Sequence, residues 1–306
     1  MKTGANPQPN TTFTPPKAIA LQLKPRKRPA RVTIELSSRC NRLCRGCPRA
    51  KMNYPQGDMP LPLFQKVLGQ LRNDTVIVPF FRGESLLHPK FEEMMRLLAA
   101  GGYRTVQLAT NGDMLNIKNS AAILSACSFV SFSLHRYDLP HSSLYPKIVD
   151  FLYGAKLHGV QTQVSILDTM IPEAAGEKER FVQQWLRHAD RVRIYAQHSR
   201  SGFGDVDRSR YKVCGDRLPC AKPFSETVVY WDGKVALCNH DWDNPSPLGD
   251  LNSQTLPDVW TAKPYGEVRR LHRAGKGAQV PSCATCDHWA VQLTPNRMFG
   301  ELYVQP

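Results

Sequence analysis

The feature that most constrains the fold is an alternation of six strand-like and intervening helix-like segments over residues 31–198. The strand-like segments are apolar and rich in β-branched residues, as strands of a buried parallel sheet are. They span residues 31–36, 75–81, 105–110, 129–134, 160–167 and 191–196. This alternation predicts an α/β domain, built either as a partial, open barrel or as a doubly wound sheet, because six units are too few for a closed eight-unit barrel. In both folds the loops after the strands carry function.

Between the strands, apolar residues recur with the period of a helix. Phe91, Met94, Met95 and Leu98 fall on one helical face of the segment 90–100. The segment 145–158 repeats this pattern and is followed by Gly159, a residue type that commonly ends helices. We therefore expect both segments to pack as helices against the sheet.

The pattern changes after residue 198. A stretch rich in Ser, Gly and Asp, residues 199–207, is typical of a linker. Two short strand-like runs then flank Asp232-Gly233, which predicts a hairpin, and a helix-like stretch covers residues 256–273. We therefore expect a tail over residues 1–30, a core domain over residues 31–198 and a smaller α+β domain over residues 199–306.

The chain is basic, with a net charge of +14, and part of the excess lies at its beginning. The first 34 residues hold seven Lys and Arg and no acidic residue, and the composition predicts a poorly ordered tail. Such a run could attract nucleic acid, but no nucleic-acid-binding motif accompanies it, so we expect no nucleic-acid partner. No apolar run is long enough to span a bilayer and no signal peptide is evident, which predicts a cytoplasmic protein that does not bind membranes.

Seven of the nine cysteines form two groups with the spacing of metal ligands. Cys40, Cys44 and Cys47 lie in a loop that directly follows the first predicted strand. Three thiolates at this spacing can hold three corners of a four-iron cluster and leave the fourth iron open to another ligand. The second group could close around zinc or around iron, and consists of Cys220, Cys238, Cys283 and Cys286.

A Cys-x-x-x-Cys-x-x-Cys loop after the first strand resembles the cluster-binding loop of the radical S-adenosylmethionine (SAM) superfamily. The resemblance implies that the first three cysteines hold a [4Fe–4S] cluster whose open iron chelates SAM. In this family, SAM is cleaved to a 5′-deoxyadenosyl radical that removes a hydrogen atom from the substrate. Gly46 departs from the family pattern, because an aromatic residue often stands there and contacts adenine.

Further segments support this resemblance. Residues 82–89 are similar to the Gly-Glu-Pro segment of the family, with Ser85 where proline is usual. The resemblance implies that Gly83 and Glu84 bind SAM, since a carboxylate pairs well with the SAM amino group. Asn111 and Ser133, near the ends of the third and fourth strands, are expected to be further SAM contacts. The alternative for Glu84 is an exposed acid in a loop.

The C-terminal region resembles the SPASM/Twitch extension of radical SAM enzymes, in residues 220–224, 231–238, 248–251 and 258–260. Four cysteines instead of seven imply the shorter Twitch form, in which the second cysteine group holds one auxiliary [4Fe–4S] cluster. The cysteine spacing is most similar to that of the radical SAM enzymes that dehydrogenate 2-deoxy-scyllo-inosamine. The fold that the resemblance implies is a partial (β/α)6 barrel with a small C-terminal α+β auxiliary-cluster domain.

The reaction is less constrained than the cofactors. Few residues precede the first strand, whereas many peptide-modifying relatives carry a leader-binding domain there. We therefore expect oxidation or epimerisation of a small polar substrate such as a sugar or aminocyclitol. Modification of a ribosomal peptide or of RNA is one alternative, and a non-catalytic protein that binds zinc and nucleic acid is another.

Several groups are candidates for proton or hydrogen transfer. Cys214 lies six residues before a predicted cluster ligand and could return a hydrogen atom to a substrate radical, as thiols do in radical SAM epimerases. The candidate proton acceptors are Arg193, Tyr195, His240 and Asp241. A reducing flavodoxin or ferredoxin is the electron donor that the resemblance implies.

Overall fold

The computed structural model of the chain describes residues 23–44, 47–134, 142–196, 217–289 and 301–305. Cys214 and Gly46 therefore lie outside the described residues. Within the described part, no helix is both long and apolar enough to cross a membrane.

The first two thirds of the chain form six parallel strands joined by helices, which confirms the predicted β–α alternation. The strands are β1 (Arg31–Ile34), β2 (Val76–Val78), β3 (Thr105–Thr110), β4 (Phe129–Ser133), β5 (Gln161–Leu167) and β6 (Arg191–Tyr195). The helices between them are α2 (Leu61–Leu68), α3 (Phe91–Ala100), α4 (Ile117–Ala126), α5 (Leu144–Leu157) and α6 (Glu177–Leu186).

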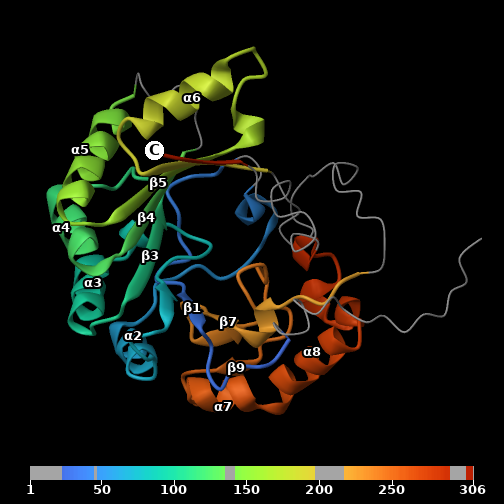
Figure 1. Ribbon diagram of the computed structural model, residues 1–306. Coiled ribbons are helices and arrows are strands. Elements are labelled where there is room, and N and C mark those ends of the chain that lie inside the picture. The colour runs from blue at the N-terminus through green and yellow to red at the C-terminus, as the bar shows by residue number, and fades with distance from the viewer. Residues whose placement is uncertain (1–22, 45–46, 135–141, 197–216, 290–300, 306) are drawn as a thin grey trace, which may run out of the picture.

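The six strands lie side by side in the order of the sequence, from β1 to β6. A doubly wound sheet would reverse this order at a switch point, and no reversal occurs between β1 and β6. Figure 1 shows the strands as an arc with α3, α4, α5 and α6 along its convex side. The fold is therefore the open, partial (β/α)6 barrel, and the doubly wound alternative is excluded.

The core lies between this arc and its helices. On α3 the four residues that share the predicted apolar face, Phe91, Met94, Met95 and Leu98, are all buried. Helix α5 likewise buries Ile148 as part of its apolar face. Burial of such side chains contributes about 1.5–3 kcal/mol each, which fixes the helices on the convex side and leaves the concave side for a site.

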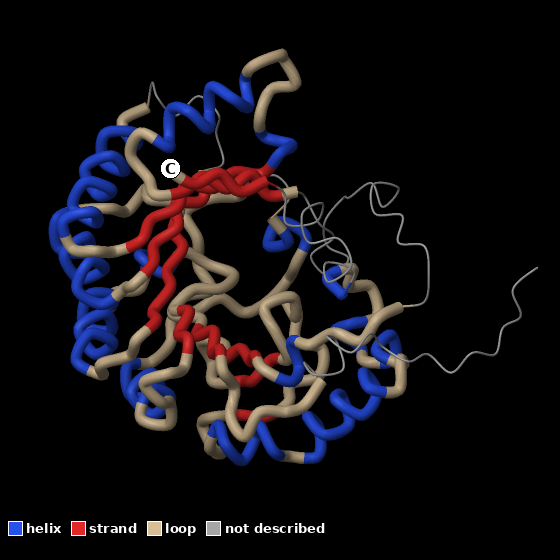
Figure 2. The backbone as a smooth tube through the Cα atoms, viewed as in Figure 1, coloured by secondary structure: helices blue, strands red, loops and turns tan. Residues whose placement is uncertain are grey.

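The C-terminal region continues the same sheet, a feature that the sequence did not predict. Strand β7 (Glu226–Val229) pairs in parallel with β1, and β8 (Lys234–Ala236) and β9 (Gly249–Asp250) follow in antiparallel order. The predicted hairpin is confirmed, and Gly233 takes the positive φ of 89° that its turn requires. At the other edge, β10 (Glu301–Val304) pairs antiparallel with β6. Figure 2 shows these strands as one continuous curved sheet.

The predicted helix-like stretch 256–273 is two helices, α7 (Leu256–Thr261) and α8 (Lys263–Arg273). They are separated by Ala262, whose ψ of 162° is extended. Pro264 explains the break, because a proline within a continuous helix removes a hydrogen bond and clashes with the preceding turn.

Residues 23–30, which the sequence places in the tail, are packed against the C-terminal region. Leu23 is buried, the Arg26 amide donates to the Phe224 carbonyl over 3.2 Å, and Trp260 Nε1 donates to the Arg26 carbonyl over 2.9 Å. This contact adds to the β1–β7 pairing in joining the two ends of the described chain.

Candidate active site

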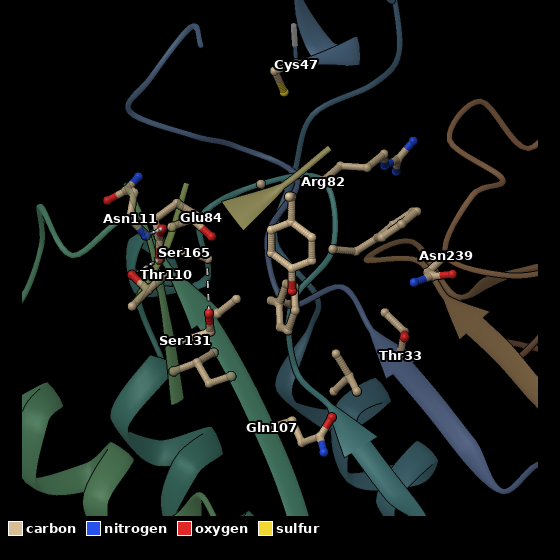
Figure 3. Close-up of a pocket in the computed structure, with 18 of the residues that line it drawn as sticks. Thr33, Cys47, Arg82, Glu84, Gln107, Thr110, Asn111, Ser131, Ser165 and Asn239 are labelled. Carbon is tan, nitrogen blue, oxygen red and sulfur yellow. Dashed lines mark hydrogen bonds between the residues drawn. The ribbon is translucent and has the colours of Figure 1, made fainter. Parts of the chain in front are cut away.

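The three cysteines of the first group lie at one end of a cavity on the concave side of the sheet. The cavity has a volume of about 690 Å³, and Cys40, Cys44 and Cys47 all line it. Cys47 precedes a 3-10 turn and its amide donates to the Cys44 carbonyl over 3.0 Å. Figure 3 shows Cys47 at this end, with Thr33 and Gln107 at the opposite end.

Side chains from the loop after β3 hold the cysteine loop in place. Asp113 accepts a hydrogen bond from Arg42 Nε over 2.6 Å and one from Asn41 Nδ2 over 2.7 Å. Asn111 Nδ2 donates to Asn41 Oδ1 over 2.8 Å. Sequence reasoning identified Asn111 but missed Asn41 and Asp113, because their pairing joins two loops that are far apart in the chain.

Glu84 is buried in the cavity wall, which excludes the alternative of an exposed loop acid. Its carboxylate accepts hydrogen bonds from Thr110 Oγ1 at 2.9 Å, the Asn111 amide at 2.8 Å and the Leu86 amide at 3.1 Å. Burial raises the pKa of Glu84, and these three donors oppose the rise. A carboxylate held in this way is ready to receive a cation from the cavity.

Gly83 is required by the close approach of two loops. A Cβ at this position would lie 2.3 Å from the Ser37 carbonyl oxygen and 2.4 Å from that of Arg39. The Glu84 amide donates to the same Arg39 carbonyl over 2.8 Å, so the loop after β2 is held against the start of the cysteine loop. Ser133, at the end of β4, also lines the cavity.

The second cysteine group lies in the C-terminal region. Burial raises the pKa of Cys238 well above its ordinary value, and three neighbouring thiols, Cys283, Cys220 and Cys286, raise it further. Cys238 therefore interacts electrostatically with the other three thiols of its group. The segments that bear them reach the cavity, since Asn239, His240, Trp242 and His288 line it, and the rings of His240 and His288 stack 4.0 Å apart.

His272, which sequence reasoning missed, contacts this second group. Its Nδ1 accepts a hydrogen bond from the Cys220 amide over 3.2 Å, and its Nε2 lies 3.6 Å from Cys283 Sγ. Burial, helped by nearby Arg217, lowers the pKa of His272 to about 4. The imidazole is therefore neutral at physiological pH, and its Nε2 proton points to a thiol.

The donor sets suit iron clusters. Among the described residues, no three His, Cys, Asp or Glu side chains lie close enough together to hold a single metal ion. One zinc ion gathers its sulfur ligands about 2.3 Å from its centre, whereas a four-iron cluster takes each thiolate at a different iron and so spaces them more widely. Thiols that interact without meeting the criterion for a single metal ion are compatible with the second arrangement.

A buried ion pair links the barrel to the C-terminal region. Arg82 Nη2 lies 2.8 Å from Glu35 Oε2, and both side chains are at most 4% exposed. Arg82 Nη1 also donates to the Trp242 carbonyl over 3.0 Å, and the guanidinium lies over the Tyr230 ring. The sequence offered no periodic signal for this contact, although Arg82 precedes the predicted SAM-binding residues.

Polar side chains on the strands line the interior of the cavity. Gln163 Nε2 donates to Ser131 Oγ over 3.1 Å and to Tyr195 Oη over 3.4 Å. Of the four candidate proton acceptors, Arg193, Tyr195 and His240 line the cavity, while Asp241 is buried and is not among the lining residues. The cavity thus combines the first cysteine group, residues beside the second group and a hydrogen-bonding interior.

The fold and this site are those expected of a radical SAM enzyme with an auxiliary-cluster extension. Comparisons with known proteins agree with this class. Residues 220–287 match the family model of SPASM, an iron–sulfur cluster-binding domain. Two curated proteins are similar over most of the chain. The S-adenosyl-L-methionine-dependent 2-deoxy-scyllo-inosamine dehydrogenase of Niallia circulans is 22% identical, covering 85% of this chain and 94% of that protein. The tungsten-containing aldehyde ferredoxin oxidoreductase cofactor-modifying protein of Pyrococcus furiosus is also 22% identical, covering 83% and 86%.

Solved structures show the same fold. BtrN in complex with AdoMet and 2-DOIA superposes with a TM-score of 0.60 at 19% identity, covering 84% of this chain and 92% of that chain. Streptococcus suis SuiB bound to its precursor peptide SuiA gives a TM-score of 0.64 at 12% identity, covering 82% and 69%. The comparisons confirm the resemblance to radical SAM enzymes with a SPASM-type extension. SAM and [4Fe–4S] clusters are accordingly its cofactors.

Proposed function

We propose that the chain oxidises or epimerises a carbinol carbon of a small polar substrate such as a sugar or aminocyclitol, with residues 31–198 as the radical SAM core and 199–306 as the auxiliary-cluster domain. One observation carries the proposal. The first cysteine group, Glu84 and residues beside the second cysteine group all line a single cavity of about 690 Å³. A cavity of this size suits small molecules.

The residues of the chain have distinct parts in this proposal. Cys40, Cys44 and Cys47 hold the SAM-binding cluster, and the auxiliary cluster is held by Cys220, Cys238, Cys283 and Cys286. When bound, the first cluster and SAM supply the 5′-deoxyadenosyl radical that removes a hydrogen atom from the substrate. Glu84 binds the SAM ammonium, and Gly83, Asn111 and Ser133 complete the SAM site. The polar side chains of β4, β5 and β6 orient the substrate.

The outcome after hydrogen removal depends on the chain's other groups. If Cys214 returned hydrogen to the opposite face, the product would be an epimer. A ketone would form instead if a base took the proton and the auxiliary cluster, when bound, accepted the remaining electron of the substrate radical. Replacing Cys214 with Ala separates the two, because it abolishes epimer formation and leaves ketone formation intact. A reducing flavodoxin or ferredoxin is the proposed electron donor.

Iron content and SAM cleavage test the proposal. The anaerobically reconstituted protein should hold about eight iron atoms and release 5′-deoxyadenosine from SAM when reduced. Cys47→Ala should abolish the release. Cys238→Ala should lose about half of the iron and still cleave SAM, and Cys127→Ala, a buried cysteine outside both groups, is the matched control. A colourless protein that holds zinc and does not cleave SAM would contradict the proposal and support the non-catalytic alternative.

A further inference from the structure

The cavity is lined by far more positive than negative side chains. Among the described residues, six arginines and one lysine line it, against the single carboxylate of Glu84. Three of these cations have an acidic partner, since Arg42 is paired with Asp113, Arg82 with Glu35 and Lys222 with Glu226. Each of these is a side-chain ion pair.

Arg191 has no acidic partner within the described residues, and Arg31 interacts electrostatically with Glu226, whose ion pair is with Lys222. Within the described part of the chain, neither guanidinium forms an ion pair or a side-chain hydrogen bond, and Arg191 Nε is buried. Arg191 lies over the ring of Phe129, at 4.3 Å from its centroid, which leaves the edge of the guanidinium for a ligand. Both side chains are half-buried, and a guanidinium removed from water is costly unless an anion joins it.

These two arginines come from opposite ends of the barrel strands and line the same cavity. Arg31 lies on β1 and Arg191 on β6, and Arg31 interacts electrostatically with Glu226 of β7 and, less strongly, with Tyr195 of β6. Arg193, two residues along β6 from Arg191, also lines the cavity and lies 5.4 Å from the centroid of the Tyr195 ring. Tyr195 in turn accepts a hydrogen bond from Gln163. Guanidinium, phenol and amide groups are thus gathered in one part of the cavity.

The charge of the cysteine groups does not explain these arginines. The cations that lower the pKa of Cys44 are Arg42 and Arg49. Those that lower the pKa of Cys220 are Lys222 and Arg217. Arg31 and Arg191 are not among these cations.

We propose that the substrate carries a negatively charged group, a carboxylate or a phosphate, which Arg31 and Arg191 bind in the interior of the cavity. This inference rests on the proposed function, because it takes this cavity as the substrate site, and it narrows the substrate class. An acidic sugar or a sugar phosphate fits the site. An aminocyclitol, whose ammonium would face two guanidiniums, does not. Planar guanidinium groups are well suited to carboxylate and phosphate oxygens.

Four hexoses of different charge test the inference, by calorimetric binding to the anaerobic holoenzyme with SAM present. The probes are glucose, glucosamine, glucuronic acid and glucose 6-phosphate. At least one anion should bind about tenfold or more tightly than glucose, since charge-assisted hydrogen bonds are about twice as strong as neutral ones. Glucosamine should bind most weakly. Whichever of the two anions binds more tightly identifies the carboxylate or the phosphate as the preferred group.

Two variants and a control locate the effect. Arg31→Gln and Arg191→Gln should each remove about tenfold of the affinity for the anion and leave that for glucose unchanged. Arg187→Gln, the same change at an exposed residue after α6, should change neither. Iron content equal to that of the wild type shows that a variant is folded.

Three results would overturn the inference: equal affinity for glucose and both anions, tightest binding of glucosamine, or no binding of either anion at millimolar concentration. A uniform loss of affinity for all sugars in Arg191→Gln would also overturn it. The release of 5′-deoxyadenosine is measured separately without sugar, so failure of the radical SAM proposal is distinguished from failure of the anion site.

Discussion

Replacing Arg82 with Met should destabilise the protein severely, because it leaves the carboxylate of Glu35 buried without a partner. Glu35 is 0% exposed and Arg82 is 4% exposed, and two of the three guanidinium nitrogens lie 2.8 Å from the carboxylate. Breaking such a pair by removing one partner costs about 3–5 kcal/mol. The loss of the Arg82 contact with the Trp242 carbonyl adds to this cost.

A double-mutant cycle tests this reasoning. Glu35→Leu combined with Arg82→Met removes both charges, so the double variant should be more stable than Arg82→Met alone. The free energy of unfolding is measured by urea denaturation of the apoprotein, followed by circular dichroism. The control is Lys178→Met, which breaks the exposed pair between Lys178 and Glu301 and should cost about 0–1 kcal/mol. A cost below about 1 kcal/mol for Arg82→Met, or strictly additive costs in the double variant, would refute the reasoning.

Three further predictions concern the walls of the site. Gly83→Ala should weaken SAM binding measured by equilibrium dialysis, because its Cβ would meet backbone oxygens at 2.3 and 2.4 Å; an unchanged affinity would contradict this. His272→Phe should lower the iron retained by the second cysteine group, because it removes the acceptor for the Cys220 amide. SAM cleavage, which depends on the first cysteine group, should be retained. Asp241→Asn should raise the free energy of unfolding of the apoprotein by on the order of 2–3 kcal/mol above about pH 6. Below about pH 4 the substitution should have no such effect. Burial raises the pKa of Asp241 to about 6, so the cost of ionising it is present only at higher pH, and equal stability curves in urea would argue against this.

Local patterns made much of the fold predictable. The apolar face of α3 and the strand β3 lie where their periodicity places them, because burial against the sheet selects the same residues that the pattern identifies. The pairing of β7 with β1 was not predictable, since nearly two hundred residues separate the two strands and neither carries a signal for its partner.

The candidate site likewise has parts that local motifs predict and parts that depend on long-range contacts. Cysteine spacing and the segment around Glu84 are local motifs, so the residues that line the end of the cavity near Cys47 could be predicted. Arg31 and Arg191 are spaced as ordinary strand residues, and only the curvature of the sheet places both in the lining of one cavity. His272 was missed because a histidine on a helix gives no indication of the amide that it will contact.

The parallel pairing of β7 with β1 has a consequence for the mechanical unity of the molecule. The four residues of β1 pair with the four residues of β7, and β2 takes the other side of β1. A fragment that ended at residue 198 would present β1 as a bare edge with open backbone groups, which invites association with other chains. The C-terminal region thus serves as the cover of the barrel edge, and the spacing between the two cysteine groups is set by a ladder of backbone hydrogen bonds.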